Sequence, residues 1–195
     1  MPVPHIVLAS GSPRRRELLS LMMLPFSTCP ADIDETFDPG QSLEGNLVDI
    51  AEKKARAAES SPAAGTPGAI LLGADTTVVF EGRPLGKPSG YDEAFATLST
   101  LQGERHRVMT GFALVTSDGC RSRGIETTLV EFSPMKPEDI ARYLETQRPY
   151  DKAGAYGIQD PLMSCFVRRI EGCYYNVVGL PVSRIHRTMR ETGLL

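Results

Sequence analysis

The feature that most restricts the fold of this sequence is the apolar run AILLGADTTVVF at residues 69–80, which one carboxylate, Asp75, interrupts. The run predicts a buried strand, a break near Asp75, and then a second strand with a turn that ends at Gly86. A buried carboxylate is costly unless it is paired, binds a metal or takes part in chemistry. An Asp turn is the structural alternative. Because Asp75 would directly follow a strand, where open α/β sheets bind ligands, we favour a functional role.

Strand and helix patterns alternate along the rest of the chain. Residues 5–9 predict a short strand, about Arg14 to Met23 a helix, and residues 43–60 the clearest amphipathic helix. Further helices are predicted within 91–103, 136–147 and 180–193, strands within 165–172 and 174–179, and a hairpin from 106–119 and 120–132 joined at Ser-Asp-Gly. This mixture indicates an α/β fold with a mixed, partly antiparallel sheet flanked by helices. No boundary divides the chain, so we expect one domain over residues 1–195.

Charge and cysteine content exclude some classes of protein. The net charge of −3 argues against a general nucleic-acid binder, although a local basic cluster can still bind a phosphate ligand. The four cysteines show no CxxC spacing, which favours free thiols. The start of the chain has no signal-peptide pattern, and the apolar runs are too short to span a bilayer. We therefore expect a cytoplasmic protein with no membrane or nucleic-acid partner.

Three arginines, Arg14, Arg15 and Arg16, occupy the predicted start of the first helix. Ser12 is a suitable N-cap and Pro13 a suitable first helical residue. Basic residues are unfavourable at this end, because the helix dipole and the free N–H groups favour negative charge there. The stretch is either a solvated charge cluster or an anion site at which amide and guanidinium groups converge on phosphate.

Other polar residues also sit where local structure does not require them. Lys54 falls on the apolar face of its predicted helix, so it must either extend to solvent or meet an anion. Lys87 lies on a tight loop that only superficially resembles a Walker A motif, and it is either a fixed cation or a plain surface lysine. Residues 151–160, DKAGAYGIQD, permit close approach to a ligand or form a tight structural loop. The three histidines lack metal-binding spacing.

Five blocks of the sequence resemble, in order, the signature blocks of the Maf nucleotide pyrophosphatases. They are LASGSPRRRELL (8–19), EKKARA (52–57), LGADTTV (72–78), LGKP (85–88) and DKAGAYGIQ (151–159), and VVGLP (177–181) also fits. The resemblance implies a fold with a deep cleft, related to the inosine triphosphate pyrophosphatases. It also implies metal-dependent hydrolysis of nucleoside triphosphates to the monophosphate and pyrophosphate, with Mg²⁺ or Mn²⁺ as cofactor. The ADT and KAGAYGIQ blocks are similar to the subgroup that acts on dTTP and UTP.

The resemblance also implies roles for individual residues. Asp75 matches the proton acceptor, and Glu35 matches a carboxylate near the metal, with Asp32 and Asp34 as alternatives in the same acidic loop. Asp75 is also expected to contact the metal. The expected substrate-binding and specificity residues are Ser12, Arg14, Arg15, Lys54, Thr76, Lys87 and Gln159. Gln159 carries both a donor and acceptors and could pair with the amide edge of uracil or thymine.

Three other readings stay open on the sequence alone. A pyrophosphatase for purine or modified nucleotides would use the same chemistry with another base pocket. A regulatory nucleotide-binding protein without turnover is a second alternative, since the family is linked to septum formation and cell division arrest. A nucleic-acid binder is the third alternative. The negative net charge and the lack of a basic surface with aromatic residues argue against it. A homodimer is compatible with the resemblance.

Overall fold

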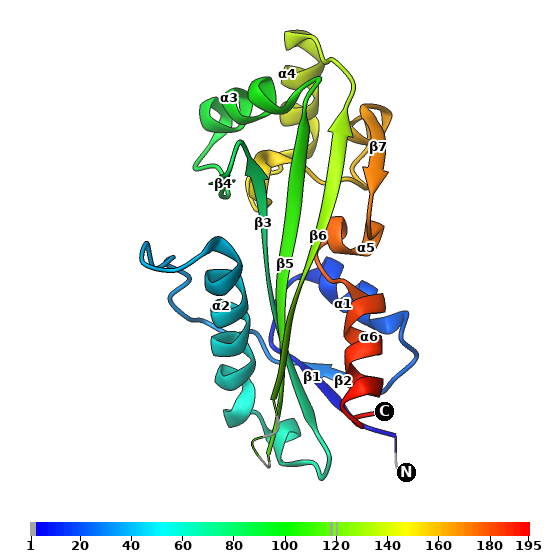
Figure 1. Cartoon of the computed structure of the whole chain (residues 1–195). Helices are drawn as coiled ribbons and strands as arrows, with labels where there is room; N and C mark the ends of the chain where they lie inside the picture. Colours follow the sequence, from blue (N-terminus) through cyan, green and yellow to red (C-terminus); the bar gives the residue numbers. More distant parts are fainter. Residues whose placement is uncertain (1–2, 118, 120) are drawn as a thin grey trace. The chain divides into compact units, whose positions relative to one another are not determined.

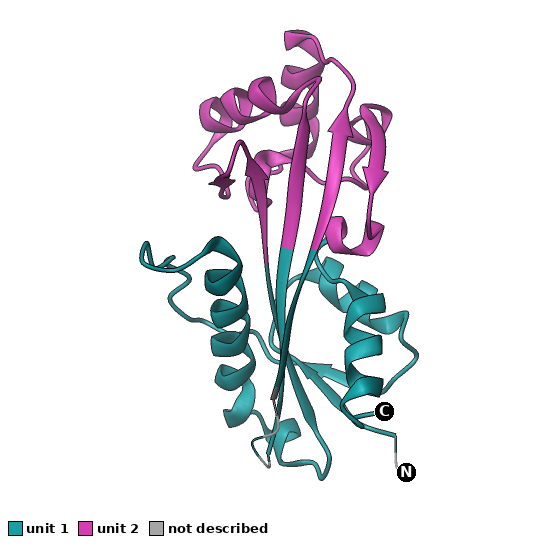
Figure 2. Cartoon of the chain, viewed as in Figure 1, with its two compact units in different colours: residues 1–75, 110–126, 179–195 teal, residues 76–109, 127–178 magenta. Residues whose placement is uncertain are grey.

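The computed structural model describes residues 3–117, 119 and 121–195, and the chain forms two compact units (Figure 1, Figure 2). Unit 1 comprises residues 1–75, 110–126 and 179–195, and unit 2 comprises residues 76–109 and 127–178. The chain passes between the units inside three long strands, β3 (Ile70–Phe80), β5 (Arg105–Thr116) and β6 (Arg121–Phe132), and once more between residues 178 and 179. The mixed α/β architecture predicted from the sequence is confirmed.

The remaining elements are short strands and helices. The strands are β1 (Ile6–Leu8), β2 (Phe26–Thr28), β4 (Arg83–Leu85) and β7 (Val167–Glu171). The α-helices are α1 (Pro13–Ser20), α2 (Leu43–Ala57), α3 (Tyr91–Leu101), α4 (Pro137–Gln147), α5 (Tyr174–Val178) and α6 (Val182–Glu191). The 3₁₀ helices are η1 (Ala58–Ser60), η2 (Pro62–Gly65), η3 (Ala153–Ala155) and η4 (Met163–Cys165). The strands form a seven-stranded sheet in the order β2-β1-β3-β5-β6-β7, and β4 pairs with β3 off this path.

Parallel pairing dominates the beginning of the sheet, in unit 1. Ile6 of β1 lies opposite Phe26 of β2 on one side and opposite Ile70 of β3 on the other, and both pairs of strands are parallel. Within this unit α2 covers one face of the strands, and α1 and α6 cover the other (Figure 1). Because both faces are covered, β1 is buried at all three positions, as expected for a parallel strand.

Antiparallel pairing dominates unit 2. Val78 of β3 pairs with Leu85 of β4, and Leu129 of β6 pairs with Glu171 of β7, both antiparallel. Strands β5 and β6 are neighbours in the sheet and are joined by a link too short for a parallel crossover. The predicted hairpin is therefore confirmed, although Asp118 of the predicted Ser-Asp-Gly turn lies outside the described residues.

Two glycines bring the backbone of α2 directly onto the sheet in unit 1. A Cβ atom at Gly73 of β3 would overlap the carbonyl oxygen of Ala51 and lie 2.7 Å from the amide nitrogen of Ala55. A Cβ atom at Gly111 of β5 would lie 2.5 Å from the carbonyl carbon of Leu47. Such distances exclude any side chain at either position, so glycine sets the spacing between helix and sheet.

The structure corrects two strand predictions. Strand β3 continues unbroken from Ile70 to Phe80, so Asp75 lies inside a strand and not after one. Residues 174–178 form helix α5 and not the predicted strand. The buried side chain of Asn176 donates to the carbonyl oxygen of Val108 and to Oγ1 of Thr128, both at 3.0 Å. These tertiary contacts require the helical turn, which overrides the β propensity of the Tyr and Val residues.

The first helix and the strand after it also differ from prediction. Helix α1 ends at Ser20 and not near Met23, because the chain turns through Met23 with a φ of 56°. Strand β2 was not predicted, because its three residues are too short to show periodicity and only pairing with β1 defines them.

The core of unit 2 contains a histidine packed among aromatic rings. His106 is 1% exposed, its Nε2 atom lies 2.7 Å from the hydroxyl of Tyr156, and its ring contacts those of Phe132 and Tyr156 edge-on. Its Nδ1 atom has no hydrogen-bond partner among the described residues. Burial lowers the pKa of His106 from 6.5 to about 4. The ring is therefore neutral at physiological pH.

The lowered pKa of His106 predicts a loss of stability in mild acid. Between pH 6.5 and pH 4 the unfolded chain binds a proton at this ring and the folded chain does not. The contribution of His106 to the free energy of unfolding is therefore fully present above pH 6.5 and decreases as the pH falls through this range. From pH 7 to pH 5 we expect the free energy of unfolding to drop by about 2 kcal/mol from this group. Urea unfolding at both pH values would measure the drop.

A pair of variants isolates the contribution of this histidine. His106→Gln should be less stable at pH 7 but should lack the drop of about 2 kcal/mol between pH 7 and pH 5. His186→Gln, at an exposed position on α6, should retain the wild-type pH dependence. Equal pH dependence in His106→Gln and wild type would contradict the prediction.

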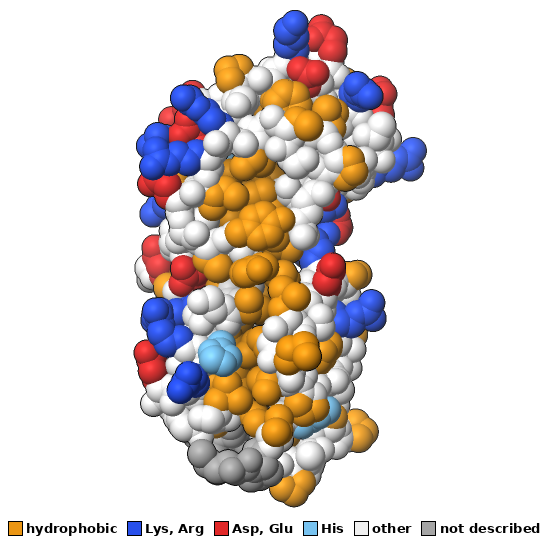
Figure 3. All heavy atoms as spheres, turned by 90° about the vertical axis from the view of Figure 1, so that its right-hand side faces the viewer, with side chains coloured by type: hydrophobic (Ala, Val, Ile, Leu, Met, Phe, Trp, Pro, Cys, Tyr) orange, Lys and Arg blue, Asp and Glu red, His pale blue; other side chains and the backbone are white. Residues whose placement is uncertain are grey.

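Some apolar side chains reach the surface, as the face in Figure 3 shows. The large exposed ones among the described residues are Val3, Leu21, Met23, Tyr91, Tyr174 and Tyr175. The cysteines at positions 29, 165 and 173 are free thiols, and Cys120 lies outside the described residues. In the described part of the chain, no helix has both the length and the apolar character needed to cross a membrane.

Candidate functional site

The centre of the candidate site is a buried lysine held between two carboxylates, all three in unit 1. Lys54 Nζ lies 2.7 Å from Oδ1 of Asp75 and 3.0 Å from Oε1 of Glu35. The side chains of Lys54 and Asp75 are 8% and 11% exposed, whereas that of Glu35 is 43% exposed. The lysine predicted on an apolar face thus meets an anion and does not extend to solvent. Glu35 forms the solvent side of this cluster.

The packing of α2 on β3 explains why these side chains meet. Gly73 and Asp75 are two residues apart on β3, so they face the same side of the sheet. Gly73 admits the α2 backbone at Ala51, and Lys54 lies about one helical turn further along, above Asp75. Gly73 was not among the residues predicted from the sequence to shape the site. A glycine inside an otherwise apolar strand is the signal that could have identified it.

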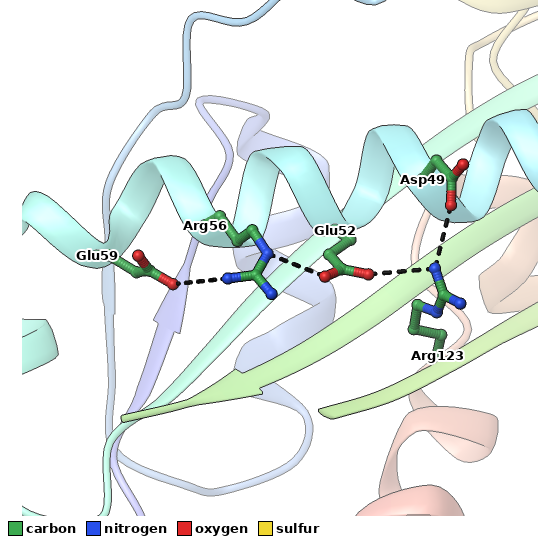
Figure 4. A network of polar contacts seen from close by, with 5 residues as sticks. All are labelled: Asp49, Glu52, Arg56, Glu59 and Arg123. Carbon is green, nitrogen blue, oxygen red and sulfur yellow. Dashed lines mark hydrogen bonds and ion pairs between the residues drawn. The ribbon is translucent and has the colours of Figure 1, made fainter. Parts of the chain in front are cut away.

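Arg56, another basic side chain of α2, belongs to a network of ion pairs at the surface (Figure 4). Arg56 pairs with Glu52 of α2 at 2.9 Å and with Glu59 of η1 at 3.4 Å. The network also includes Asp49 and Arg123, which belong to α2 and β6. Most of these side chains are well exposed, so each pair contributes little to stability. The Lys54 cluster differs because its ammonium group and Asp75 are buried.

The N-terminus of α1 presents its arginines as predicted. Ser12 caps the helix, since its Oγ accepts the N–H of Arg15 at 3.4 Å, and Pro13 is the first helical residue. Nε of Arg15 donates to the carbonyl oxygen of Gly179 at 2.9 Å, which joins the blocks at 8–19 and 177–181. Arg14 is half-buried, and Arg16 is exposed as expected for a surface residue.

Electrostatics tie Arg15 to the carboxylate cluster. Burial lowers the pKa of the Arg15 guanidinium, and the negative charges of Asp75 and Glu35 oppose this shift, while Arg14 adds to it. The charges of Arg14, Asp75 and Glu35 therefore all act on Arg15 within unit 1. Together with Lys54 they form a compact arrangement of positive and negative charge, which suits a phosphate ligand with a bound cation.

The acidic loop before α2 supplies one carboxylate to this cluster. Of the three candidates there, Glu35 contacts Lys54, whereas the carboxylate of Asp34 accepts the backbone N–H of Thr36 at 2.9 Å. Asp32 and Asp34 are exposed. The geometry therefore favours Glu35 as the partner of Asp75.

The donor set fits a divalent cation that shares its ligands with a substrate. Glu35 and Asp75 offer hard oxygen ligands, and Mg²⁺ is usually held by one or two carboxylates together with substrate phosphates. In residues 3–117, 119 and 121–195, no group of three or more His, Cys, Asp or Glu side chains could hold a metal by itself. Two carboxylates fit a shared site and do not form a closed, all-protein one.

The other predicted residues belong to unit 2. Thr76 follows Asp75 on β3 and is half-buried, while Lys87 and Gln159 are exposed on loops. Gly154 N donates to the carbonyl oxygen of Gly86 at 3.0 Å, so the loop with Lys87 meets the loop with Gln159. A Cβ atom at Gly154 would lie 2.7 Å from a methyl group of Val78, which explains why this loop needs a glycine. The small residues of 151–160 therefore permit close packing against β3.

The fold and the charge arrangement define a mixed α/β protein with a site suited to a phosphate ligand. The family model described as "Maf-like protein" matches residues 5–192, and the chain belongs to the Maf family. It is 52% identical over 185 residues to a "dTTP/UTP pyrophosphatase" of Chlorobaculum tepidum, covering 95% of this chain and 93% of that protein. It is 49% identical over 190 residues to a protein of the same name from Pelodictyon phaeoclathratiforme, covering 97% and 98%. Among solved structures, the Staphylococcus aureus Ham1 protein matches 68% of this chain and 73% of that chain, with a TM-score of 0.47 and 16% identity.

Proposed function

We propose that this chain hydrolyses nucleoside triphosphates, above all dTTP and UTP, to the nucleoside monophosphate and pyrophosphate. The observation that carries the proposal is the cluster of buried Lys54 and Asp75 with the exposed Glu35, in a chain that belongs to the Maf family. The preference for dTTP and UTP is supported by the names of relatives that share about half of their residues with this chain. We also propose that residues 1–195 act as one domain, since one family model matches residues 5–192.

In this mechanism Asp75 accepts a proton from the water that attacks the α-phosphorus, and pyrophosphate leaves. A carboxylate in this role must be held in a fixed position relative to the water. Lys54 fixes Asp75, because it is buried and donates to Oδ1 of Asp75 at 2.7 Å. Displacement at phosphorus depends mainly on positioning and charge neutralisation. Arg14, Arg15 and Lys87 supply further positive charge for the phosphate oxygens.

A divalent cation, Mg²⁺ or Mn²⁺, would be held by Glu35 and Asp75 and would supply neutralisation of charge on the phosphates. In the structure the ammonium group of Lys54 contacts both of these carboxylates. Triphosphate oxygens would offer Lys54 an alternative anionic partner and so release carboxylate oxygens. The proposal includes the roles that the family resemblance implies for three further residues. Thr76 and Gln159 contribute to the choice of substrate, and Ser12 binds the substrate.

A panel of nucleoside triphosphates tests the proposed function. The purified chain with Mg²⁺ or Mn²⁺ should release pyrophosphate, and dTTP and UTP should give higher kcat/KM values than CTP, ATP, GTP and 7-methyl-GTP. Removing the metal with a chelator should abolish the release. A preference for a purine nucleotide would favour the alternative base pocket. Nucleotide binding without any pyrophosphate release would instead identify a regulatory binding protein.

A further inference from the structure

The loop that carries Gln159 is held by one buried hydroxyl group, that of Tyr143 on α4. Tyr143 is 1% exposed. Its hydroxyl donates to Oδ2 of Asp160 at 2.7 Å and accepts the N–H of Gly157 at 3.1 Å. Gly157 and Asp160 flank Ile158 and Gln159, so the same oxygen atom holds the chain on both sides of Gln159.

Further contacts within unit 2 make this attachment rigid. The carboxylate of Asp160 folds back over Gly157, where a Cβ atom would lie 2.5 Å from Oδ1 of Asp160. Lys152 Nζ also approaches Oδ2 of Asp160 at 3.4 Å, and the N–H of Asp160 donates to the carbonyl oxygen of Gly157 at 3.0 Å. Tyr156 and Ile158 are buried, whereas Gln159 is exposed. The loop thus anchors its apolar side chains and presents the amide of Gln159 outward.

The burial of Tyr143 supports its role as a hydrogen-bond donor. Burial, followed by the hydrogen bond to Asp160, raises the pKa of the Tyr143 hydroxyl, so it stays protonated at every physiological pH. A protonated phenol can donate to the carboxylate and accept from the amide at the same time. The proposed chemistry of phosphate binding and hydrolysis does not involve Tyr143 or Asp160, although both side chains are hydrogen-bonded and largely buried.

We infer that Tyr143 and Asp160 are positioning residues for base selection, because they fix the backbone on both sides of Gln159. This inference rests on the proposed function. An amide side chain offers a donor and acceptors to many nucleobases, so its residue type alone gives little selectivity. Selectivity arises when the amide is held where only one base edge can meet it, since a site built to hydrogen-bond a group rejects ligands that lack it. Because Tyr143 is 1% exposed, its effect on the substrate is exerted through the loop.

Tyr143→Phe tests the inference, because it removes the hydroxyl and keeps the ring. We expect KM for UTP and dTTP to rise about tenfold, the change that corresponds to one lost hydrogen bond to a charged group. We expect kcat to change less than about twofold and the ratio of kcat/KM between UTP and CTP to narrow. Tyr91→Phe, at an exposed tyrosine of the same unit, should leave all three quantities unchanged.

Variants of the partner residue separate positioning from general instability. Asp160→Ala should raise KM as Tyr143→Phe does. Asp160→Asn keeps an acceptor for the hydroxyl, so this variant should retain the wild-type base preference. The double variant of Tyr143→Phe and Asp160→Ala should raise KM by less than the product of the two single effects, since both substitutions remove the contact between the hydroxyl and the carboxylate. These variants also test the inference if Tyr143→Phe fails to fold.

The outcomes distinguish this inference from the proposed function. If the wild-type chain releases no pyrophosphate from any nucleotide, the proposed function fails and the inference fails with it. If the wild type is active and Tyr143→Phe keeps its KM and its base preference, only the inference fails. A uniform loss of kcat for every nucleotide would also overturn it, because positioning of Gln159 predicts an effect that depends on the base.

Discussion

Replacing Asp75 with Asn is expected to lower kcat for UTP by about a thousandfold, the loss usual for a proton acceptor in catalysis. The substitution keeps the shape of the side chain but removes its charge and its capacity to take a proton from water. The amide oxygen of Asn can still accept a hydrogen bond from Lys54, which now lies 2.7 Å from Oδ1 of Asp75. We therefore expect a folded protein with a specific chemical defect. Pyrophosphate release at saturating UTP measures it.

The matched control for this prediction is Asp49→Asn. Asp49 lies on α2 and pairs with Arg123 at 3.1 Å, in the surface network of Figure 4. This substitution also removes one negative charge, but it should change kcat less than twofold and stability by less than about 1 kcal/mol. Thermal unfolding of both variants would show that they fold. A wild-type rate in folded Asp75→Asn would exclude Asp75 as the proton acceptor and as an essential metal ligand.

Replacing Gly73 with Ala is expected to lower the free energy of unfolding by about 3 kcal/mol, at the upper end for overpacking. The added methyl group would meet the backbone of α2 at Ala51 and Ala55, and backbone cannot move aside as a flexible side chain can. For a chain of this length the loss corresponds to a decrease in Tm of about 10 °C. Calorimetry or circular dichroism on heating would measure it.

The same substitution should also reduce activity, because it displaces the helix that carries Lys54. Gly65→Ala is the matched control, since a Cβ atom at Gly65 meets nothing within 4 Å, and its stability should change by less than about 0.5 kcal/mol. If Gly73→Ala had wild-type stability and activity, the close packing of α2 on β3 would not be what positions Lys54 against Asp75.

Lys54 illustrates how far sequence reasoning reaches. Its place on the apolar face of a helix identified it as unusual, and the helix itself was predicted correctly. Whether a lysine in this position extends to solvent or binds an anion depends on what lies opposite, more than twenty residues away along the chain. Periodicity describes one element at a time, so it could not choose between the two outcomes.

For Asp75 the predicted local structure was wrong. The sequence marked it as functional for a sound reason, the cost of a carboxylate in an apolar run. It was nevertheless placed after a strand, because its carboxylate was interpreted as a break in the buried pattern. The structure accommodates Asp75 inside β3 because its carboxylate binds Lys54, and it accommodates Gly73 there because this residue receives the backbone of α2. Residues unfavourable to a strand by propensity are tolerated there because tertiary contacts satisfy them.

By itself the sequence determined the class of fold, most helices and the cap at Ser12. It also identified the charged residues that the local secondary structure does not explain. These features depend on the pattern of neighbouring residues and on residue chemistry, and both can be recognised in a short stretch of sequence. Only the tertiary structure decided that Lys54 joins Asp75 to Glu35, that Gly73 sets their spacing, and that Tyr143 holds the loop of Gln159. Each is a contact between distant segments, whose distance and burial exist only once the chain has packed.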